Sequence, residues 1–247
     1  MKLLQWNVWY KEDVNNIVTF LKEINPDIIC LQELTINHPE FNQGVDTSKY
    51  IANELGFNYY FKDAQTSTNN GKEYTLGNGI FSRFPILQSR FHYIQEPSNP
   101  NDQNTDYSAE GRLYVEVELD TPNGEYTIGT VHMSYTDRFV STPAKEAETR
   151  ELIKVVQEKE KQYLLTGDFN ALPESYTITE LQKYLKNVGP EVEAKTWTTK
   201  PFSYNGFEAT TLDWRLDYGF MTPDIQVRSA EILNTEYSDH LPLLIEF

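Results

Sequence analysis

The sequence predicts an α/β (α+β) fold in which two mixed β-sheets pack together with helices outside them. Apolar runs of strand length outnumber helix-like segments, which disfavours a simple doubly wound parallel sheet. A hydrophobic content of 39% with 13% aromatic residues favours a folded globule over a disordered chain. The length of 247 residues suits one large domain or two small ones, and because no low-complexity linker divides it we expect a single domain over residues 1–247.

The N-terminal segments predict a strand, a helix and a second strand. Residues 2–8 form the first strand-like run. Residues 14–24 have apolar side chains at helical spacing, Asp13 before them is a suitable N-cap, and a proline follows. Residues 27–33 are a continuous apolar run that finishes on the carboxylate of Glu33.

The next segments predict a short helix, further strands and two loops. We expect a helix at 48–55, a strand at 57–61, a polar loop over 62–77 and a strand at 87–94. Residues 95–109 are rich in Pro, Asn, Asp, Ser and Gln and have no periodic apolar pattern. A mobile loop is expected there, and loops of this length are often functional or disordered.

A β-hairpin and a helix are predicted in the centre of the chain. Residues 113–119 alternate between apolar and polar side chains, and a Thr-Pro-Asn-Gly turn leads back through 126–131 to His132. A helix is expected from Pro143 to about residue 160, because proline suits the first helical position.

An apolar run beginning at Tyr163 stops abruptly at Gly167, which predicts a buried strand. Asp168 and Asn170 then lie at the C-terminal end of this strand, where open α/β sheets place their chemistry. The remaining segments predict a helix at 175–186 and strands at 212–221, at 226–234 and in the last apolar run to Phe247.

Eight polar side chains fall at or near the ends of predicted strands. Taken singly, each has a simpler explanation: an asparagine after a strand is usually a turn residue, a glutamate is usually solvated, and a buried histidine is usually part of the core. The recurrence of acid, amide and imidazole groups at so many strand ends favours a shared functional site. These residues are Asn7, Glu33, His132, Asp168, Asn170, Asp217, Asp239 and His240.

The residue types favour a hard divalent cation. Carboxylate and amide oxygens suit Mg²⁺ or Mn²⁺, which take few protein carboxylates and complete their shells with water and substrate phosphate. With four histidines and one cysteine, a zinc cage is hard to assemble, and Cys30 in its apolar run is expected to be a buried, inert thiol. We expect His38 and His92 to be structural or solvent-exposed.

The formal net charge of −16 disfavours nucleic-acid binding by a broad basic surface, because that mode needs clustered lysine and arginine. Local basic contacts still allow nucleic acid as a substrate. No apolar stretch is long enough for a signal peptide or a membrane span. We therefore expect a cytoplasmic protein, and we expect a monomer.

Eight short motifs stand in order along the chain: Leu4-Gln5-Trp6-Asn7, Ile29-Cys30-Leu31-Gln32-Glu33, Gly79-Ile80-Phe81-Ser82-Arg83, Glu110-Gly111-Arg112, Thr130-Val131-His132, Gly167-Asp168-Phe169-Asn170, Trp214-Arg215-Leu216-Asp217-Tyr218 and Ser238-Asp239-His240. In this order they resemble the motifs of the endonuclease/exonuclease/phosphatase superfamily, from residue 4 to residue 242. That superfamily includes DNase I, AP endonucleases of the exonuclease III type, neutral sphingomyelinases, inositol polyphosphate 5-phosphatases and deadenylases. The resemblance implies a four-layer α/β sandwich with the site at one edge.

The resemblance also implies roles for the residues at the strand ends. Glu33, with Asn7 beside it, would hold the divalent cation, and Asp239 would contribute to the metal region. Asp168 and Asn170 would orient the attacking water and contact the scissile phosphate.

Two histidines have further implied roles. His240 would act as general base or as phosphate-stabilising cation, with its tautomer held by Asp217. AP endonucleases carry a tyrosine at the position of His132, whereas the DNase I, sphingomyelinase and deadenylase branches carry a histidine that contacts the phosphate or protonates the leaving group. The motifs around Arg112 and Trp214 instead resemble the AP endonuclease branch, so the subfamily signals are mixed.

Arg112 and Trp214 are the expected substrate-binding residues. The guanidinium of Arg112 suits a phosphate, although without the motif a surface ion pair with a nearby glutamate is an equally good interpretation. Trp214 would stack on the substrate, whereas core packing is the better interpretation for Trp197, Tyr135 and Phe139.

The sequence therefore predicts a divalent-metal-dependent phosphoester hydrolase of the phosphodiesterase or nuclease type, in which water attacks phosphorus with the help of a His-Asp pair and Mg²⁺ or Mn²⁺. The alternative enzyme is a phosphodiesterase or phosphatase for a small or lipid-derived phosphoester, similar to sphingomyelinases or inositol phosphatases. A non-catalytic binding module on the same fold would lack one or more of the site residues. The complete set disfavours that interpretation.

Overall fold

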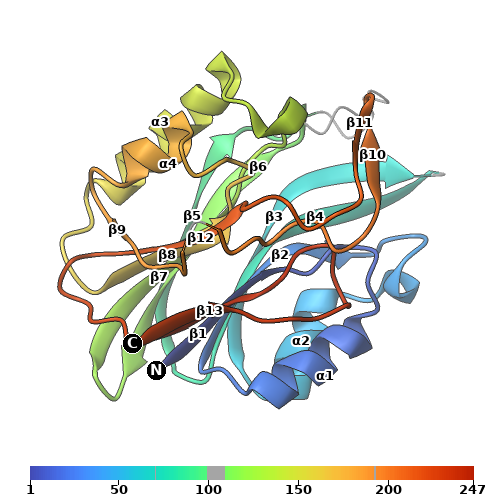
Figure 1. Ribbon diagram of the computed structural model, residues 1–247. Helices are drawn as coiled ribbons and strands as arrows, with labels where there is room; N and C mark the ends of the chain where they lie inside the picture. The colour runs from blue at the N-terminus through green and yellow to red at the C-terminus, as the bar shows by residue number, and fades with distance from the viewer. Residues whose placement is uncertain (70, 99–108, 192) are drawn as a thin grey trace.

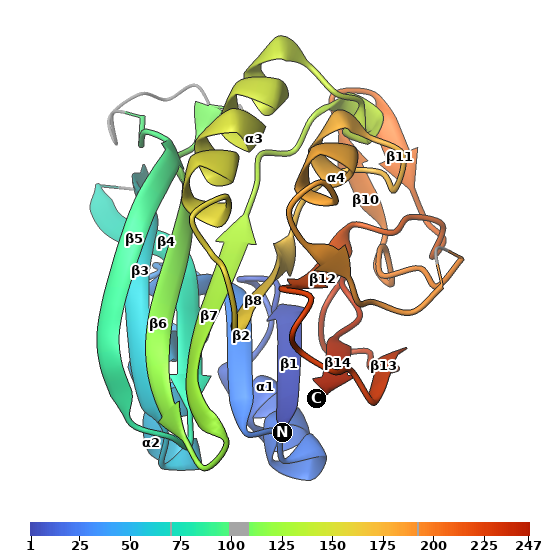
Figure 2. The same ribbon diagram turned by 90° about the vertical axis from the view of Figure 1, so that its left-hand side faces the viewer.

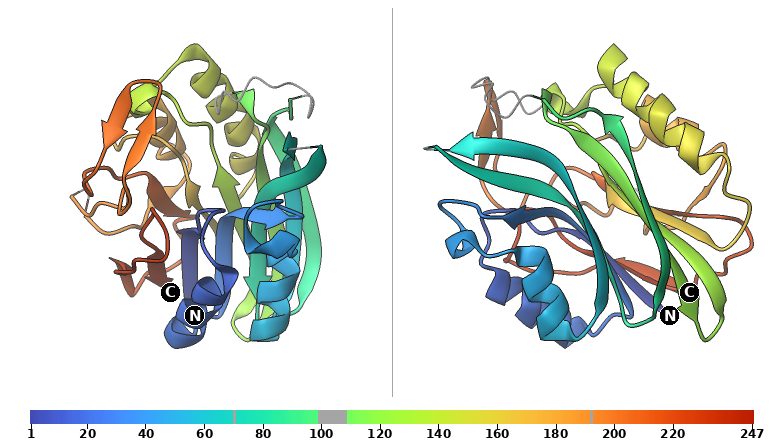
Figure 3. Two further views of the ribbon diagram at one scale, coloured as in Figure 1. Left: turned by 90° about the vertical axis from the view of Figure 1, so that its right-hand side faces the viewer. Right: turned by 180° about the vertical axis from the view of Figure 1, so that it is seen from behind.

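The computed structural model describes residues 1–69, 71–98, 109–191 and 193–247 of the chain. Two six-stranded β-sheets pack face to face, and helices cover the outer face of each sheet (Figures 1 and 3). Each sheet contains both parallel and antiparallel strand pairs. The predicted sandwich of two mixed sheets flanked by helices is therefore confirmed.

The first sheet contains the N-terminal strands. In spatial order it consists of β13 (Ser229–Ile232), β14 (Leu243–Glu246), β1 (Lys2–Asn7), β2 (Ile28–Ile36), β4 (Lys72–Ser82) and β3 (Asn58–Asn69). Successive side chains of a strand point to opposite faces. Leu4 and Trp6 accordingly pack on the helix side of β1, while Leu3 and Gln5 face the second sheet.

Two helices cover the outer face of the first sheet. α1 (Val14–Ile24) begins after Asp13, whose side chain accepts a hydrogen bond from the backbone N–H of Asn15, as the sequence predicts. α2 (Thr47–Leu55) is capped in the same way by Asp46. Their apolar faces share one hydrophobic cluster with β1 and β2.

The second sheet contains the central strands. In spatial order it consists of β5 (Ile86–Gln95), β6 (Arg112–Thr121), β7 (Gly124–His132), β8 (Tyr163–Asp168), β12 (Asp217–Met221) and β9 (Lys186–Asn187). The predicted hairpin that ends at His132 is the pair β6 and β7. Two helices, α3 (Pro143–Val156) and α4 (Tyr176–Leu181), pack on its outer face (Figure 2).

Aliphatic side chains from both sheets form the core between them. Leu3, Ile28 and Ile80 of the first sheet meet Val115 and Leu164 of the second, and all five are fully buried. The thiol of Cys30 lies in this layer, and burial raises its pKa to about 12, so it stays protonated and unreactive as expected.

The polar loop predicted over 62–77 is wrong. This segment belongs to β3 and β4, which pair as an antiparallel hairpin out to Asn69 and Lys72. Many side chains of the hairpin are exposed or only partly buried, so its sequence lacks the apolar run of a buried strand. Backbone hydrogen bonds between the two strands form whatever the side-chain polarity.

Several predicted elements are shorter in the structure. α3 ends at Val156 rather than near residue 160, and α4 is a six-residue helix rather than a helix over 175–186. The strands expected at 212–221 and 226–234 are reduced to β12 and β13. Of the loop predicted at 95–109, residues 99–108 lie outside the described residues, and β5 takes in Gln95.

A small third sheet was not predicted. It is a hairpin of β10 (Phe202–Tyr204) and β11 (Phe207–Ala209), joined by Asn205 and Gly206, which both have positive φ angles (Figure 1). An Asn-Gly pair is a strong signal for such a two-residue turn. Short 3₁₀ helices occur at Asn42–Gly44 and Asp137–Phe139.

Candidate active site

Strand register brings three of the predicted polar residues together at one edge of the second sheet. His132 at the end of β7 is the register partner of Asp168 at the end of β8. Asp168 is also the partner of Asp217, the first residue of β12. Neighbouring strands lie roughly 5 Å apart, so these side chains form a row at the sheet edge.

The first sheet adds Asn7 and Glu33 to this row. Asn7 ends β1, and its side-chain N–H groups donate to Glu33 Oε1 at 3.0 Å and to Asp168 Oδ2 at 3.1 Å. The second of these bonds crosses from one sheet to the other. The site is therefore built where the two sheets meet.

The prediction that β2 ends at Glu33 is wrong. The strand continues to Ile36, but its register with β4 shifts between Leu31 and Leu34. Glu33 lies within this β-bulge at φ 61°, a left-handed conformation that is uncommon for glutamate. The bulge turns the carboxylate of Glu33 toward Asn7 and the backbone N–H of Tyr10, which donates to Oε2 at 3.1 Å.

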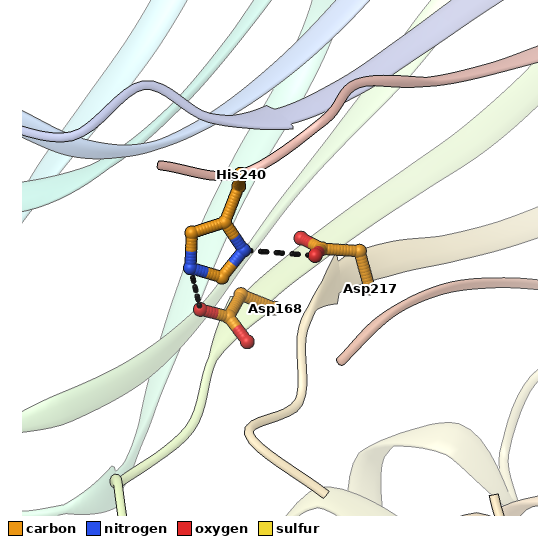
Figure 4. A group of neighbouring side chains, drawn as sticks. All are labelled: Asp168, Asp217 and His240. Atoms are coloured by element: carbon orange, nitrogen blue, oxygen red, sulfur yellow. Dashed lines mark hydrogen bonds and ion pairs between the residues drawn. The ribbon is translucent and has the colours of Figure 1, made fainter. Parts of the chain in front are cut away.

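His240 lies between two aspartates, as Figure 4 shows. Its Nδ1 is 2.8 Å from Asp217 Oδ2, and its Nε2 is 3.6 Å from Asp168 Oδ2. Burial by itself would lower the pKa of His240, but the negative charges of the two aspartates outweigh burial and hold its pKa well above the ordinary value. The imidazole is therefore a cation at neutral pH.

The loop that carries His240 is tied to β1. Ser238 Oγ donates to the carbonyl of Asn7 at 2.7 Å, and Trp6 Nε1 donates to the carbonyl of His240 at 2.9 Å. These two bonds fix the loop backbone, so the imidazole is presented to the aspartates by a rigid support.

His132 is in the opposite protonation state. Its Nε2 lies 3.3 Å from Asn170 Nδ2 and 3.5 Å from Asp168 Oδ2. Burial, followed by the positive charges of Arg112, His240 and Lys145, lowers its pKa well below the ordinary value. The site therefore contains one cationic and one neutral imidazole.

Asp168 and Asn170 share a short turn after β8. The backbone N–H of Asn170 donates to Asp168 Oδ1 at 2.9 Å, and Asn170 Nδ2 donates to the carbonyl of Met133 at 3.0 Å. Burial raises the pKa of Asp168 to about 6 against the opposing effect of His240. At neutral pH the carboxylate is ionised and still a usable proton acceptor.

The residues predicted to hold a metal fit Mg²⁺ or Mn²⁺. Burial, followed by the negative charge of Asp239, raises the pKa of Glu33 to about 7. Asp239 Oδ2 accepts a hydrogen bond from Trp197 Nε1 at 3.1 Å. Two carboxylates that repel each other, with the amide oxygen of Asn7 nearby, are an all-oxygen donor set for a hard cation.

Asp168, Asp217 and His240 also lie close enough together to be metal ligands, with donor atoms within 4.8 Å of one another. Hydrogen bonding does not distinguish this group from Glu33, because both oxygens of Asp217 and both oxygens of Glu33 accept hydrogen bonds. A protonated imidazole, however, is a poor metal ligand. This group is therefore better suited to proton transfer, and the candidate metal region is that of Glu33 and Asp239.

Arg112 lies beside the metal region. It lines a solvent-connected pocket with about 290 Å³ of empty space, together with Glu33, Asn78 and His132. Its Nη2 is 2.9 Å from Glu110 Oε2, which is the ion pair considered as the alternative to substrate binding. The two interpretations are compatible, because the paired side chain still faces the pocket.

The rings of Phe139 and Trp197 lie between Trp214 and His240. The ring of Trp214 packs on Phe139 at 5.1 Å, and its backbone pairs with that of Trp197. It is the ring of Trp197 that lies 6.3 Å from the ring of His240. Tyr135 packs in the same aromatic cluster, in which Trp197 and Phe139 are buried, as the core-packing interpretation expects.

The other two histidines lie apart from this row. His38 is buried, and its Nδ1 accepts a hydrogen bond from the backbone N–H of Phe41 at 3.2 Å. His92 is 41% exposed and lies 3.5 Å from Glu151. Both match the expectation of structural or exposed histidines.

Two residues that contribute to the site were given no role by the sequence. Gln5 donates to Asp217 Oδ1 at 2.9 Å from a fully buried position in β1. Lys145 of α3 is also buried, and its Nζ donates to the carbonyl of Ser134 at 2.6 Å. The signal for both was a polar side chain on a face that the periodicity assigns to the interior.

The comparisons with known proteins concern the family and the fold of the chain. A model of the endonuclease/exonuclease/phosphatase family matches residues 4–240. A search of curated proteins found no match. In the residues that the structure describes, no helix is long and apolar enough to cross a membrane.

Solved structures share the fold at low identity. An endonuclease/exonuclease/phosphatase from Beutenbergia cavernae has a TM-score of 0.72 at 19% identity, covering 99% of this chain and 70% of that one. The human Nocturnin catalytic domain has a TM-score of 0.69 at 20% identity, with 99% and 93% covered. A mannosyl-6-phosphatase from Bacteroides thetaiotaomicron has a TM-score of 0.67 at 16% identity, with 100% and 98% covered. With the family model matching nearly the whole sequence, the chain belongs to the endonuclease/exonuclease/phosphatase family.

Proposed function

We propose that the protein is a divalent-metal-dependent phosphoester hydrolase in which water attacks phosphorus in line with the leaving group. The observation that supports this most directly is the row of Asp168, a cationic His240 and a neutral His132 beside the paired carboxylates of Glu33 and Asp239. Hydrolysis of a phosphoester needs a proton acceptor for water and positive charge around the phosphoryl oxygens. This row contains both.

In the proposed reaction, Asp168 accepts a proton from the attacking water, which its raised pKa of about 6 suits. Asn170 helps to orient that water and contacts a phosphoryl oxygen. His240, cationic through its bond to Asp217, acts as the phosphate-stabilising cation rather than as the base. His132 donates an N–H to a further oxygen or to the leaving group.

Asn7, Glu33 and Asp239 would hold Mg²⁺ or Mn²⁺. When bound, the cation would stabilise charge on the phosphoryl oxygens and the leaving group. Arg112 lines the same pocket as Glu33 and would contact a substrate phosphate. Trp214 would support Phe139 and, through it, the ring of Trp197 beside His240.

The leading substrate class is a phosphodiester, including nucleic acid. A specific observation favours a second class, because a net charge of −16 repels polyanions. That class is a small or lipid-derived phosphoester, and the presence of a mannosyl-6-phosphatase among the proteins of similar fold supports it. Activity on a polyanion should change strongly with added salt, whereas activity on a small substrate should respond little.

The test is hydrolysis of a chromogenic phosphodiester and a chromogenic phosphomonoester with Mg²⁺, with Mn²⁺ and with a chelator. Asp168→Asn and His240→Gln should each lose at least about a thousandfold in kcat/KM, by analogy with the loss of other acid–base groups. His92→Gln makes the same change at an exposed histidine and should keep full activity. Turnover that survives in correctly folded Asp168→Asn protein would exclude the proposed mechanism.

A further inference from the structure

Gln5 of β1 places an amide in the layer between the two sheets. The residue is fully buried, and its neighbours on the same face of the strand are Leu3 and Asn7. Its Nε2 has two N–H groups, and both are used: one donates to Asp217 Oδ1 and the other to Gln32 Oε1, each at 2.9 Å. Burying an amide is costly unless its donors are satisfied. Both donors of Gln5 are satisfied, one of them by the carboxylate that holds His240.

We propose that Gln5 is a positioning residue for the reaction, fixing the carboxylate of Asp217 so that Oδ2 meets His240 Nδ1. The catalytic part of this inference rests on the proposed function. The positional part concerns the geometry of the His-Asp pair alone and can be tested without any turnover.

The carboxylate needs a second support because its own torsion is soft. The last torsion of an aspartate side chain has a broad, twofold profile rather than three sharp wells. Held only by His240 at Oδ2, the group could rotate about that bond. A donor at Oδ1 removes this freedom.

The orientation of Gln5 is itself determined by the next residues inward. Gln32 Oε1 can only accept, so it requires the N–H end of Gln5. Gln32 in turn donates to Thr130 Oγ1 at 2.8 Å, and Thr130 Oγ1 donates to the carbonyl of Thr166 at 3.2 Å. A flipped Gln5 would set its carbonyl against the Asp217 carboxylate, two acceptors facing each other. The chain of bonds therefore has one favourable direction, which ends at the imidazole.

The test replaces the amide by an apolar group of similar length in Gln5→Met. With the best chromogenic phosphoester and saturating Mg²⁺, kcat should fall about 10- to 100-fold with KM changed less than about twofold, the effect usual for groups that orient a functional side chain. Gln88→Met makes the same change at an exposed position of β5 and should leave kcat unchanged.

A double-mutant cycle distinguishes positioning from general damage. If Gln5 acts through Asp217, then Gln5→Met should cost nothing further in protein that already carries Asp217→Asn. A structural defect would reduce kcat by the same factor in both backgrounds, and that result would overturn the proposal. If Gln5→Met fails to fold, Gln32→Met is the second variant. It removes the acceptor that fixes the Gln5 amide, so the amide can rotate and kcat should still fall several-fold. An unchanged kcat in Gln32→Met would also overturn the proposal.

Nuclear magnetic resonance of ¹⁵N-histidine-labelled protein gives the readout that does not depend on turnover. The Nδ1–H of His240 should give a protected downfield proton signal that broadens or shifts in Gln5→Met and persists in Gln88→Met. An unchanged signal would reject the positional part. A further outcome is that the wild-type protein hydrolyses no phosphoester while the Nδ1–H signal of His240 still changes in Gln5→Met. In that case the proposed function fails, and the role of Gln5 in holding Asp217 stands.

Discussion

The buried ammonium of Lys145 helps to hold the segment of the site that follows His132. Its Nζ donates to the carbonyl of Ser134, and the backbone N–H of Ser134 donates to Glu148 Oε2 at 3.1 Å. Burial lowers the pKa of Lys145 to about 8, against the raising effects of Glu148 and Asp168. The two α3 side chains thus hold the segment that follows His132, at the expense of burying a charge.

This pKa shift predicts a pH dependence of stability. Between pH about 8 and 10.5 the unfolded chain keeps the Lys145 proton and the folded chain loses it, so the free energy of unfolding rises with pH across that window. The rise should approach about 3 kcal/mol, since one pKa unit is worth about 1.4 kcal/mol. The difference in the free energy of unfolding between wild type and Lys145→Met, measured by denaturant titration, should therefore change in favour of wild type as pH increases. Lys161→Met corrects for loss of an exposed charge, and a difference independent of pH would contradict the prediction.

Removal of one carboxylate from the metal region should weaken cation binding. Glu33→Gln removes one of the two negative charges, so the Mg²⁺ concentration for half-maximal activity should rise by at least about tenfold. Calorimetric titration of Mn²⁺ into the protein provides a measurement without substrate. Glu40→Gln, at an exposed carboxylate, is the matched control. Equal cation affinity in Glu33→Gln and wild type would show that the metal region lies elsewhere.

At the residue scale, the sequence predicted the polar groups at strand ends, because a strand end is visible as the point where an apolar run stops. Asp168 and His132 were found in this way, and strand register brings them side by side. Gln5 and Lys145 were missed because their importance depends on what lies opposite them, a strand distant in sequence for Gln5 and the loop before α3 for Lys145. Local patterns contain no such information.

At the element scale, the close approach of β7 and β8 controls the position of Asp168. Gly167 precedes it at φ 154°, and a Cβ there would lie 2.1 Å from the carbonyl oxygen of Val131. No side chain fits that space, so the two strands could not keep their register with a larger residue. The glycine that ended the apolar run in the sequence is therefore required by the neighbouring strand.

Gly167→Ala should cost about 3–5 kcal/mol, from unfavourable backbone geometry and from overlap with the β7 carbonyl. Gly206→Ala is the matched control, because Gly206 also has positive φ, 80°, but has nothing within 4 Å of the added Cβ. It should cost only about 1–2 kcal/mol. Free energies from denaturant unfolding give both numbers, and equal losses would mean that the strand contact is unimportant.

The elements that the sequence predicted well are those with strong end signals. α1 has its Asp13 cap, and β7 follows a turn rich in proline and glycine. The β3–β4 hairpin was mistaken for a loop because most of its side chains over 62–76 are polar and exposed or only partly buried, so no apolar alternation marks a strand there. The hairpin of β10 and β11 had a usable signal in Asn205-Gly206, but strands of three residues are too short for periodicity.

At the scale of the whole molecule, the net charge of −16 should limit stability at low ionic strength. Screening lengths fall from about 30 Å at 0.01 M salt to about 8 Å at 0.15 M. We expect added NaCl to stabilise the fold by about 1 kcal/mol, or about 2–4 °C in Tm for a chain of this size. Thermal unfolding is measured with a chelator present, in NaCl and separately in choline chloride. An equal rise of Tm in the two salts excludes specific cation binding as its cause. A Tm that is flat or falls with salt would contradict this expectation.

The layered architecture could be predicted from the excess of strands over helices and from the family resemblance. Which residues face which layer could be read only where alternation is clear, as in β1. The meeting of two sheets at the site could not be predicted from local patterns, because it requires knowing that β1 packs across from β8 and β12.

Directional bonds cross the layer between the sheets at several points. Apolar contacts alone would let two sheets slide past each other at little cost, since hydrophobic attraction has no preferred direction. The bonds from Gln5 to Asp217, from Gln32 to Thr130 and from Asn78 to the carbonyl of Leu113 each tolerate only small displacements. They therefore oppose shear between the sheets, the motion that would separate Glu33 and the His240 loop, which the first sheet holds, from Asp168 and His132 of the second sheet without unfolding either half.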